Sequence, residues 1–437
     1  MFSSFLFLLS KNMSSDIETQ DREALSNLQL KQLQNMLGPI LKDNIFYQQK
    51  LNAVGITRPE DLQTMADYAQ LPFTSKAELS DDQMAHPPYG SNLTLALDHY
   101  VRVHQTSGTT GHPLRWLDTD ESWMWFAQCW KRVYQGAGVT AADRIFFAFS
   151  FGPFIGFWTA HEGARVLGAL SISGGSMTSV QRLQAIQDHQ ATVLVCTPTY
   201  ALHLAEVAEA EGMDIVQGSV QTTIHAGEPG AGLPATRQRI EQAWGATCYD
   251  HAGATEVGAW GFECQVRDGM HVNEGEFIFE VIDPDTLKPA KEGELVVTNL
   301  GRVGMPVIRY RTGDRVKLNR NMCACGSSFW RLEGGVIGRV DDALIIRGVN
   351  VYPSSIENVV RTFPEVAEFA VDIYRRHEMA DMDIRLEVQG ETPDAVAHAV
   401  AQEIRHLLGI RARVEVVAQN TLPRFELKAK RFTDHRL

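Results

Sequence analysis

The sequence predicts an α/β fold: a large amino-terminal α/β domain with a β-rich subdomain, followed by a small, mobile α+β domain. Three observations predict it. Strand-like and helix-like segments alternate between residues 144 and 253, which is typical of a parallel sheet with crossover helices. From residue 271 the pattern becomes β-rich. A final unit of about a hundred residues begins near residues 338–342.

The amino-terminal part begins with a helical pattern of leucines over residues 21–52. Short helices separated by turns follow over 55–80, then a strand at 100–106 and an aromatic-rich helix at 120–135. The alternating region follows. We expect its strands at 144–150, 170–173, 192–198, 220–229 and 247–253, and its helices at 159–169, 179–190, 200–212 and 235–245.

The β-rich subdomain is predicted to contain antiparallel hairpins at residues 276–283, 293–300 and 306–318. The last unit reads helix, strand, strand, helix, strand. These segments are 354–363, 368–376, 382–389, 392–409 and 412–418. We therefore predict a disordered start over 1–20, an amino-terminal domain over 21–337 and a carboxyl-terminal domain over 338–437.

Composition limits the class of function. The chain has 437 residues and a net charge of −13, with no basic patch, which argues against a nucleic-acid partner. Six dispersed cysteines fit a reducing compartment, so we expect a cytoplasmic protein. The apolar run at residues 5–9 is too short for a membrane span or a secretory signal peptide, so no membrane partner is expected. Met13 is an alternative start, and a weak signal anchor is the less favoured alternative.

The stretch HQTSGTTGHPLRW, residues 104–116, has the chemistry of a phosphate cradle. Glycines allow close backbone approach, and hydroxyl and N–H groups bind phosphate oxygens. The candidate ligands are Ser107, Gly108, Thr109, Thr110 and Gly111. The NTPase P-loop is a different motif, because it needs a lysine where this chain has His112. A cluster of this kind is, by itself, also compatible with a plain surface turn.

Five further segments join this loop in an order that resembles the adenylate-forming superfamily, and within it the phenylacetate–CoA ligases. The six are TSGTTGHP (106–113), GEP (227–229), YDHAGATE (249–256), YRTGD (310–314), GRVDDALIIRGVNVYPSSIE (338–357) and LPRFELKAKR (422–431). The resemblance covers nearly all the chain after about residue 45. It implies the fold of these enzymes and an AMP-forming ligation: an acid and ATP give acyl-AMP, and coenzyme A then takes the acyl group.

The resemblance assigns roles to single residues. Lys428 is the catalytic cation of the tail, with Lys430 and Arg431 as rivals for that register. Glu256 is the Mg²⁺ ligand, which suits an ion that binds few carboxylates together with phosphate oxygens, and Thr255 holds an α-phosphate oxygen. The alternative for Glu256 is an ordinary acid at a helix amino terminus.

Further nucleotide contacts are implied. They are Gly227, Glu228, Pro229, Asp250 and His251 on the adenine side, with Asp314 and Arg339 at the ribose and phosphate. Asp341 is the hinge about which the small domain swings between the two half-reactions. An ordinary turn aspartate is the alternative for Asp314, and a structural ion pair is the alternative for Arg339.

Three positions depart from the family pattern. Ala252 stands where an aromatic residue often stacks on adenine, so Tyr249 or His251 takes that place or the stacking is lost. His112 replaces the phosphate-loop lysine, and Leu427 replaces the glycine before the catalytic lysine.

Cys264, His271, Cys323 and Cys325 form a complete ligand set for a closed, structural zinc site. Some relatives in the family that the chain resembles carry a similar set. The alternative is that these are unrelated buried thiols.

An aromatic segment predicts an apolar acyl pocket suited to an aryl or arylacetic acid. Its residues are Phe149, Phe151, Phe154, Trp158, Ala226 and Ala254, each of which could instead be plain core. Two other functions stay open: an adenylating enzyme that passes the acyl group to a carrier-protein thiol or an amine, and a nucleotide-binding regulator without turnover. The family resemblance also implies a homodimer.

Overall fold

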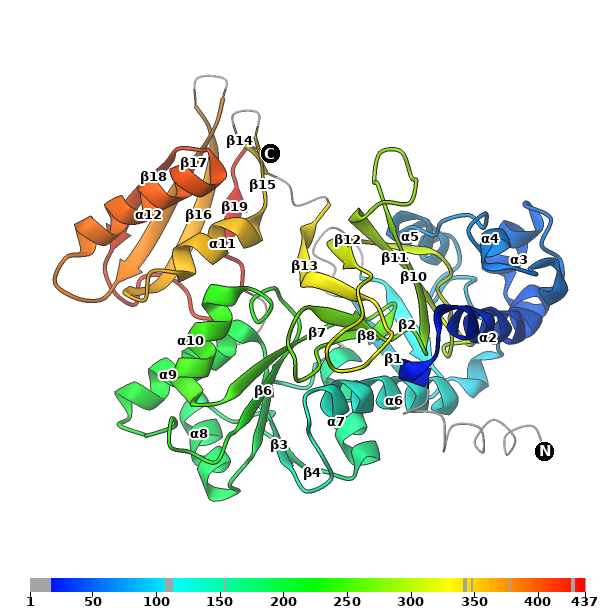
Figure 1. Ribbon diagram of the computed structural model, residues 1–437, viewed down its shortest axis with the longest axis horizontal. Helices are drawn as coiled ribbons and strands as arrows, with labels where there is room; N and C mark the ends of the chain where they lie inside the picture. The colour runs from blue at the N-terminus through cyan, green and yellow to red at the C-terminus, as the bar shows by residue number, and fades with distance from the viewer. Residues whose placement is uncertain are drawn as a thin grey trace. The chain divides into compact units, whose positions relative to one another are not determined.

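The computed structural model describes residues 17–106, 113–152, 155–340, 344–346, 349–376, 379–425 and 429–436 (Figure 1). Its contacts divide the chain into two compact units. The first contains residues 1–142, 151–171 and 251–335, and the second contains 143–150, 172–250 and 336–437. The domain boundary after residue 337 stays a prediction. None of the helices in the described part of the chain combines the length and apolarity needed to cross a membrane.

The first unit begins earlier than expected. Ile17–Thr19 form a 3-10 helix (η1), and Glu18 pairs with Arg132 at 2.9 Å, so the predicted disorder does not extend to residue 20. The expected helix over 21–52 is two helices, α2 (Arg22–Asp43) and α3 (Ile45–Asn52). Asn44 separates them because its extended backbone ends α2 while its side chain accepts the N–H of Tyr47 and caps α3.

Short helices continue this unit as expected. They are η2 (Pro59–Asp61), α4 (Met65–Tyr68), α5 (Lys76–Ala85) and η3 (Leu97–His99). The strands β1 (Arg102–Gln105) and β2 (Arg115–Asp118) pair antiparallel on either side of the glycine-rich loop. The helices α6 (Asp120–Gly136) and α7 (Ile155–Leu167) pack against each other.

The β-rich part lies in the first unit, with the strand order β10-β11-β12-β13-β9-β8. Their bounds are β8 (Gly258–Phe262), β9 (Met270–Val272), β10 (Phe277–Ile282), β11 (Glu292–Asn299), β12 (Tyr310–Asn319) and β13 (Arg331–Arg339). The pairs β10–β11 and β11–β12 are antiparallel, which confirms the predicted hairpins.

The second unit contains the predicted parallel sheet. Strands β3, β5, β6 and β7 pair parallel, and β4 lies beside β3. Their bounds are β3 (Arg144–Phe147), β4 (Leu170–Ser173), β5 (Val193–Cys196), β6 (Thr222–His225) and β7 (Thr247–Ala254). The helices α8 (Ser179–Asp188), α9 (Pro198–Ala210) and α10 (Pro234–Trp244) contribute to its apolar core.

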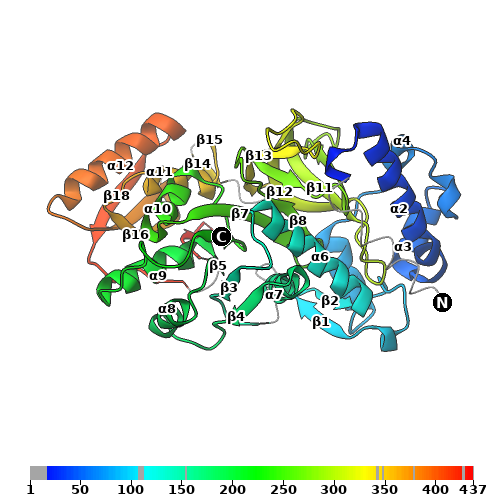
Figure 2. The same ribbon diagram turned by 60° about the horizontal axis from the view of Figure 1, so that its bottom comes forward.

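The last hundred residues have a second core of their own within this unit. The hairpin β14 (Leu344–Ile346) and β15 (Val349–Val351) leads to a sheet of order β18-β17-β16-β19. Helices α11 (Pro353–Arg361) and α12 (Pro393–Leu408) pack together against this sheet (Figure 2). The strands are β16 (Val366–Arg376), β17 (Met379–Val388), β18 (Ala412–Val417) and β19 (Phe432–Asp434).

Candidate active site and metal centre

The GEP turn follows β6 in the second unit, at the carboxyl end of the parallel strands, where ligands usually bind. Gly227 has a φ of +98°, a value that glycine adopts without strain. Glu228 accepts two backbone N–H groups: Oε1 from Thr199 at 3.0 Å and Oε2 from Ala429 at 2.7 Å. Asp250 pairs in register with His225, which places it at the same edge of the sheet.

Glu256 lies in the first unit, on the turn that joins β7 to β8. The alternative of a helix amino terminus is therefore wrong. The hydroxyl of Tyr310 donates to Glu256 Oε1 at 3.0 Å. Arg302 donates to the carbonyl oxygens of Thr255 and Glu256, at 2.8 and 3.3 Å. Because Arg302 is fully buried and paired with Asp118 at 2.7 Å, it fixes the backbone of this turn.

Asp314 lies in β12, next to an irregularity in the pairing of β11 with β12. Gly313 has a φ of +75°, and its N–H donates to Glu294 Oε1 at 3.1 Å. The N–H of Asp314 donates to Thr312 Oγ1 at 3.0 Å. This irregularity is a β-bulge within β12 that hydrogen bonds hold in place. Asp314 therefore lies in a strand, and the alternative of an ordinary turn aspartate is wrong.

His251 packs inside the first unit. Its Nδ1–H donates to the carbonyl oxygen of Gly261 at 2.6 Å, and its ring lies 4.2 Å from that of Trp130. Burial lowers its pKa to about 4, so the imidazole is neutral at pH 7. Tyr249 is buried as well.

The predicted acyl-pocket residues differ in environment. Phe149 is 1% exposed and its ring lies 5.8 Å from that of Phe147, as for a core residue. Phe151 and Trp158 form an aromatic pair with ring centroids 4.7 Å apart. Trp158 is 42% exposed and donates to the carbonyl oxygen of Gly152 at 2.8 Å. Ala226 is buried and Ala254 half-buried.

Several predicted site residues lie outside the described residues. They are Ser107, Gly108, Thr109, Thr110, Gly111, His112, Phe154, Asp341 and Lys428. Their neighbours are described. Thr106 closes the base of the glycine-rich loop through its N–H to the carbonyl oxygen of Leu114, at 2.9 Å. Arg339 is half-buried at the end of β13.

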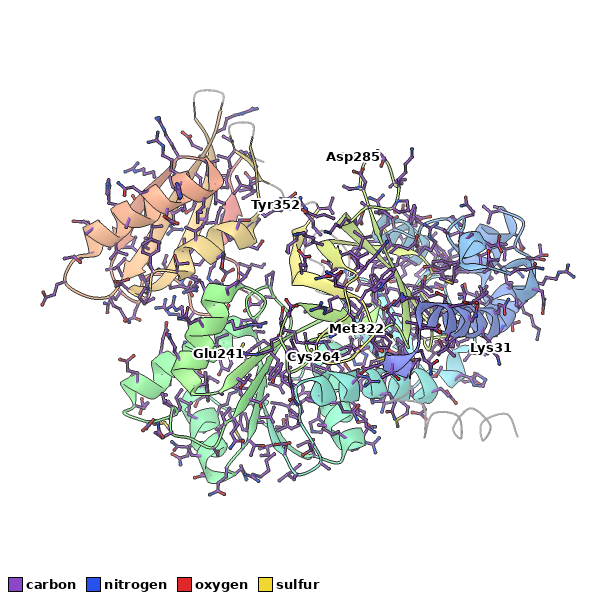
Figure 3. All side chains as sticks on the ribbon, in the orientation of Figure 1. Lys31, Glu241, Cys264, Asp285, Met322 and Tyr352 are labelled. Atoms are coloured by element: carbon purple, nitrogen blue, oxygen red, sulfur yellow. The ribbon has the colours of Figure 1, made fainter. Side chains whose placement is uncertain are left out.

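The four predicted metal ligands lie together in the first unit. Their ligand atoms are all within 4.8 Å of one another. Cys264 Sγ lies 3.7 Å from Cys323 Sγ, and Cys325 Sγ lies 3.6 Å from His271 Nε2. In Figure 3, Cys264 and Met322, the neighbour of Cys323, lie close together. The alternative of unrelated thiols is therefore wrong.

The histidine of this cluster is in the neutral form that binds a metal. Burial lowers the pKa of His271 to about 4, so its imidazole is neutral. Its Nδ1–H donates to the carbonyl oxygen of Phe329 at 3.2 Å, which leaves Nε2 as the ligand atom. Burial raises the pKa of the Cys323 thiol, but hydrogen bonds from Cys325 and Cys264 together with Arg331 outweigh it and bring the pKa below its usual value. Burial raises the pKa of the Cys264 thiol, and it raises that of Cys325 to about 12. Three cysteines and one neutral histidine fit zinc.

Sequence comparison gives the family. Residues 42–302 match the model of the AMP-binding enzyme family, and residues 348–436 match that of the AMP-binding enzyme C-terminal domain. The chain belongs to the AMP-binding, adenylate-forming enzymes. The adenylate-forming enzyme is 32% identical to a phenylacetate-coenzyme A ligase of Thermus thermophilus, over 94% of this chain and 96% of that protein. It is 31% identical to the Escherichia coli ligase of the same name, over 98% and 99%.

Solved structures agree. A 2-hydroxyisobutyryl-CoA ligase in its postadenylation state, in complex with 2-HIB-AMP, has a TM-score of 0.90 at 29% identity, covering 96% of this chain and 91% of that chain. The same ligase in its thioesterification state, with CoA, has a TM-score of 0.72 at 30% identity and the same coverage. The predicted fold and the prediction of an AMP-forming carboxylate–CoA ligase that uses ATP and CoA are confirmed.

Four residues that the sequence analysis did not identify make hydrogen bonds to the predicted site of this adenylate-forming enzyme. Tyr310 binds Glu256, Arg302 fixes its turn, and Thr199 and Ala429 bind Glu228. Tyr310 is the first residue of the YRTGD segment, and Ala429 directly follows Lys428, so each lay within a recognised motif. Arg302 and Thr199 had no such signal.

Proposed function

We propose that this carboxylate–CoA ligase activates an arylacetic acid of the phenylacetate type. The observation that carries the proposal is the identity of 31–32% to phenylacetate-coenzyme A ligases over nearly the whole chain. The aromatic pair of Phe151 and Trp158 supports it, because exposed aromatic surface suits an aryl ring. A short hydroxy acid is the second candidate, favoured by the TM-score of 0.90 to a 2-hydroxyisobutyryl-CoA ligase.

The nucleotide roles follow the sequence prediction. Residues Ser107 to Gly111 bind the polyphosphate, Thr255 binds the α-phosphate, and Asp314 and Arg339 bind the ribose side. Gly227, Pro229, Asp250 and His251 form the adenine side. The rigid turn at Glu256, fixed by Arg302 and Tyr310, supports a role in holding a metal ion. A Mg²⁺ ion held there would offset the repulsion between the acid and ATP.

The two half-reactions use the tail in turn. Lys428 stabilises the charge that develops as the carboxylate oxygen attacks the α-phosphorus and pyrophosphate leaves. Rotation at Asp341 then moves the small domain, so that the thiol of CoA can attack the acyl carbon and AMP leaves. A carrier-protein thiol or an amine is the alternative acceptor.

The homodimer, the carrier-protein partner and the cytoplasmic location stay predictions from the sequence.

The cluster of Cys264, His271, Cys323 and Cys325 is proposed to hold a structural Zn²⁺. The donor set supports this, since it fills four tetrahedral positions and leaves none open for water. The residues that would hold it come from the loop before β9, from β9 itself and from the loop between β12 and β13.

A panel of acids tests the substrate proposal. Release of AMP is measured with ATP, Mg²⁺ and CoA for phenylacetate, benzoate, acetate and 2-hydroxyisobutyrate. We expect phenylacetate to have the highest kcat/KM, by about tenfold, since the aryl ring adds buried apolar area. Highest activity with 2-hydroxyisobutyrate would establish the second candidate instead. Replacing CoA by a carrier protein or an amine identifies the acceptor.

A further inference from the structure

Within the second unit, the tail that carries Lys428 is tied to the GEP turn, α9 and β17 by residues before and after the lysine. After it, the N–H of Ala429 donates to Glu228 Oε2 at 2.7 Å. Before it, Arg424 pairs with Glu206 of α9 at 3.1 Å and with Glu387 of β17 at 2.7 Å. The described residues before and after the proposed catalytic lysine are therefore both held by carboxylates, through a side chain at Arg424 and through a backbone N–H at Ala429.

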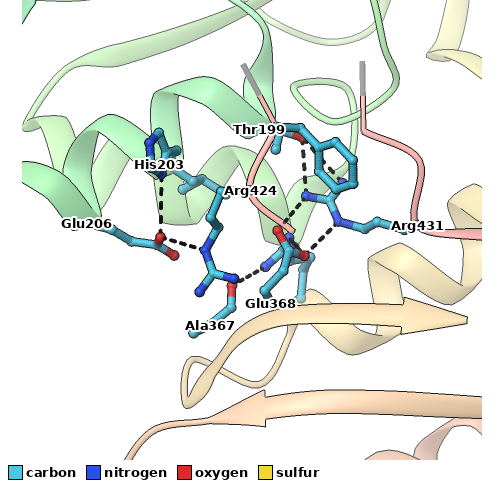
Figure 4. A pocket seen from close by; sticks show the side chains of 10 residues that line it. Thr199, His203, Glu206, Ala367, Glu368, Arg424 and Arg431 are labelled. Atoms are coloured by element: carbon cyan, nitrogen blue, oxygen red, sulfur yellow. Dashed lines mark hydrogen bonds and ion pairs between the residues drawn. The ribbon is translucent and has the colours of Figure 1, made fainter. Parts of the chain in front are cut away.

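Thr199, at the start of α9, connects these ties. Its N–H donates to Glu228 Oε1 at 3.0 Å, and its hydroxyl oxygen accepts from Arg431 at 3.3 Å. Arg431 also donates through Nε and Nη2 to Glu368, at 2.7 and 3.1 Å (Figure 4). One small cluster thus joins the GEP turn, α9, β16 and the tail.

The cluster is charged and buried. Burial alone lowers the pKa of Arg431, but Glu357 and Glu368 raise it above its usual range. Burial raises the pKa of Glu368, yet Arg361 and Arg431 hold it at about 2. These groups therefore stay ionised at neutral pH and hold the tail by charge-assisted hydrogen bonds. Because Arg431 is committed to this network, it is not the rival catalytic cation.

We propose that Glu228 is a positioning residue for adenylation, which aims Lys428 through the N–H of Ala429 instead of binding the nucleotide. The inference rests on the proposed role of Lys428. Ala429 directly follows Lys428 in the sequence, so a hydrogen bond at Ala429 acts on the residue next to the lysine. Both carboxylate oxygens of Glu228 are engaged by N–H groups. A one-ångström error in the placement of a catalytic group can cost about a hundredfold in rate.

Comparing the two half-reactions tests the role of Glu228. Thioester formation does not need the lysine at the phosphate, so the Glu228 contact should matter only for adenylation. Glu228→Gln keeps the shape of the side chain but leaves one oxygen to accept N–H groups where the carboxylate has two. Glu209→Gln is the matched control, because Glu209 is an exposed acid on α9, the helix that contains Thr199.

Two assays are run on the full chain of each variant and of Lys428→Ala. The first is acid-dependent exchange of labelled pyrophosphate into ATP without CoA, with kcat and KM for ATP. The second is thioester formation from supplied acyl-adenylate and CoA. For Glu228→Gln we expect about a tenfold lower kcat of exchange, an ATP KM within about twofold, and an unchanged thioester rate. Glu209→Gln should match the wild type in both.

Three results would overturn the role of Glu228. A raised ATP KM at unchanged kcat would make Glu228 a nucleotide ligand, equal losses in both assays would make it a general structural residue, and no loss would leave it without a role. Arg431→Lys provides a second variant. It keeps the positive charge but loses the bidentate contact with Glu368. It should lower the rate of pyrophosphate exchange and leave the rate of thioester formation unchanged. Full exchange in Lys428→Ala would instead remove the proposed role of the lysine.

Discussion

At the residue scale, Glu276 is an acid that the sequence pattern did not single out. It precedes β10, is half-buried, and accepts the indole N–H of Trp125 at 2.6 Å. Burial raises its pKa to about 7, although the Trp125 N–H and Arg132 favour the charged form. Glu276 therefore remains largely protonated in the folded protein under mildly acidic conditions.

This acid makes stability depend on pH. An unfolded glutamate releases its proton near pH 4.5, whereas the folded protein keeps the Glu276 proton up to about pH 7. The stability from this group is complete below pH 4.5 and falls as pH rises to about 7. Glu276→Gln cannot titrate and does not lose this stability. The melting temperature of the variant minus that of the wild type should therefore increase between about pH 5 and pH 8.

Thermal unfolding at several pH values checks this prediction. Glu60→Gln is the control, because Glu60 is exposed and its substitution should leave the pH profile unchanged. Parallel curves for Glu276→Gln and the wild type would show that Glu276 does not titrate in this range.

The sequence predicted the two carboxylates of the site but not the residues that hold them. Motifs identified Glu256 and Asp314, because each lies in a short segment whose neighbours are informative. Their partners come from elsewhere along the chain: Tyr310 for Glu256, and Glu294 for the bulge beside Asp314. Long-range hydrogen bonds leave no local pattern, so only the structure shows what fixes these carboxylates.

At the scale of elements, periodicity predicted the strands and helices of the parallel sheet and of the last unit. It failed where a single side chain or a short length decides the outcome. Asn44 divides the first long helix by capping the second. The strand β8 is Gly-Ala-Trp-Gly-Phe, five residues that are all buried, so it shows no alternation of apolar and polar side chains.

The metal cluster combines His271 of β9 with cysteines from the loops that precede β9 and β13, and the sequence predicted its members. We expect purified protein to contain about one zinc per chain and to melt at a lower temperature after chelation. Cys323→Ser should lose most of the zinc, since it removes one of four ligands. Cys129→Ser, in α6 and outside the cluster, should keep it. Metal-free protein with unchanged stability would refute the zinc proposal.

At the scale of the whole molecule, the order of six motifs was enough to predict the family, and the comparisons confirm it. The motif order predicts which segments serve the nucleotide, but it contains no distances. The acid substrate is harder to predict. It depends on the shape of a pocket, and Phe149, one of the residues expected to line it, packs as core.

The central claim is that the chain forms an acyl-adenylate before CoA is needed, with Lys428 as the cation. Exchange of labelled pyrophosphate into ATP, measured without CoA, tests it most directly. We expect exchange that requires the acid, continues in the absence of CoA and is lost in Lys428→Ala. Exchange that starts only when CoA is added, or that persists undiminished in Lys428→Ala, would contradict it.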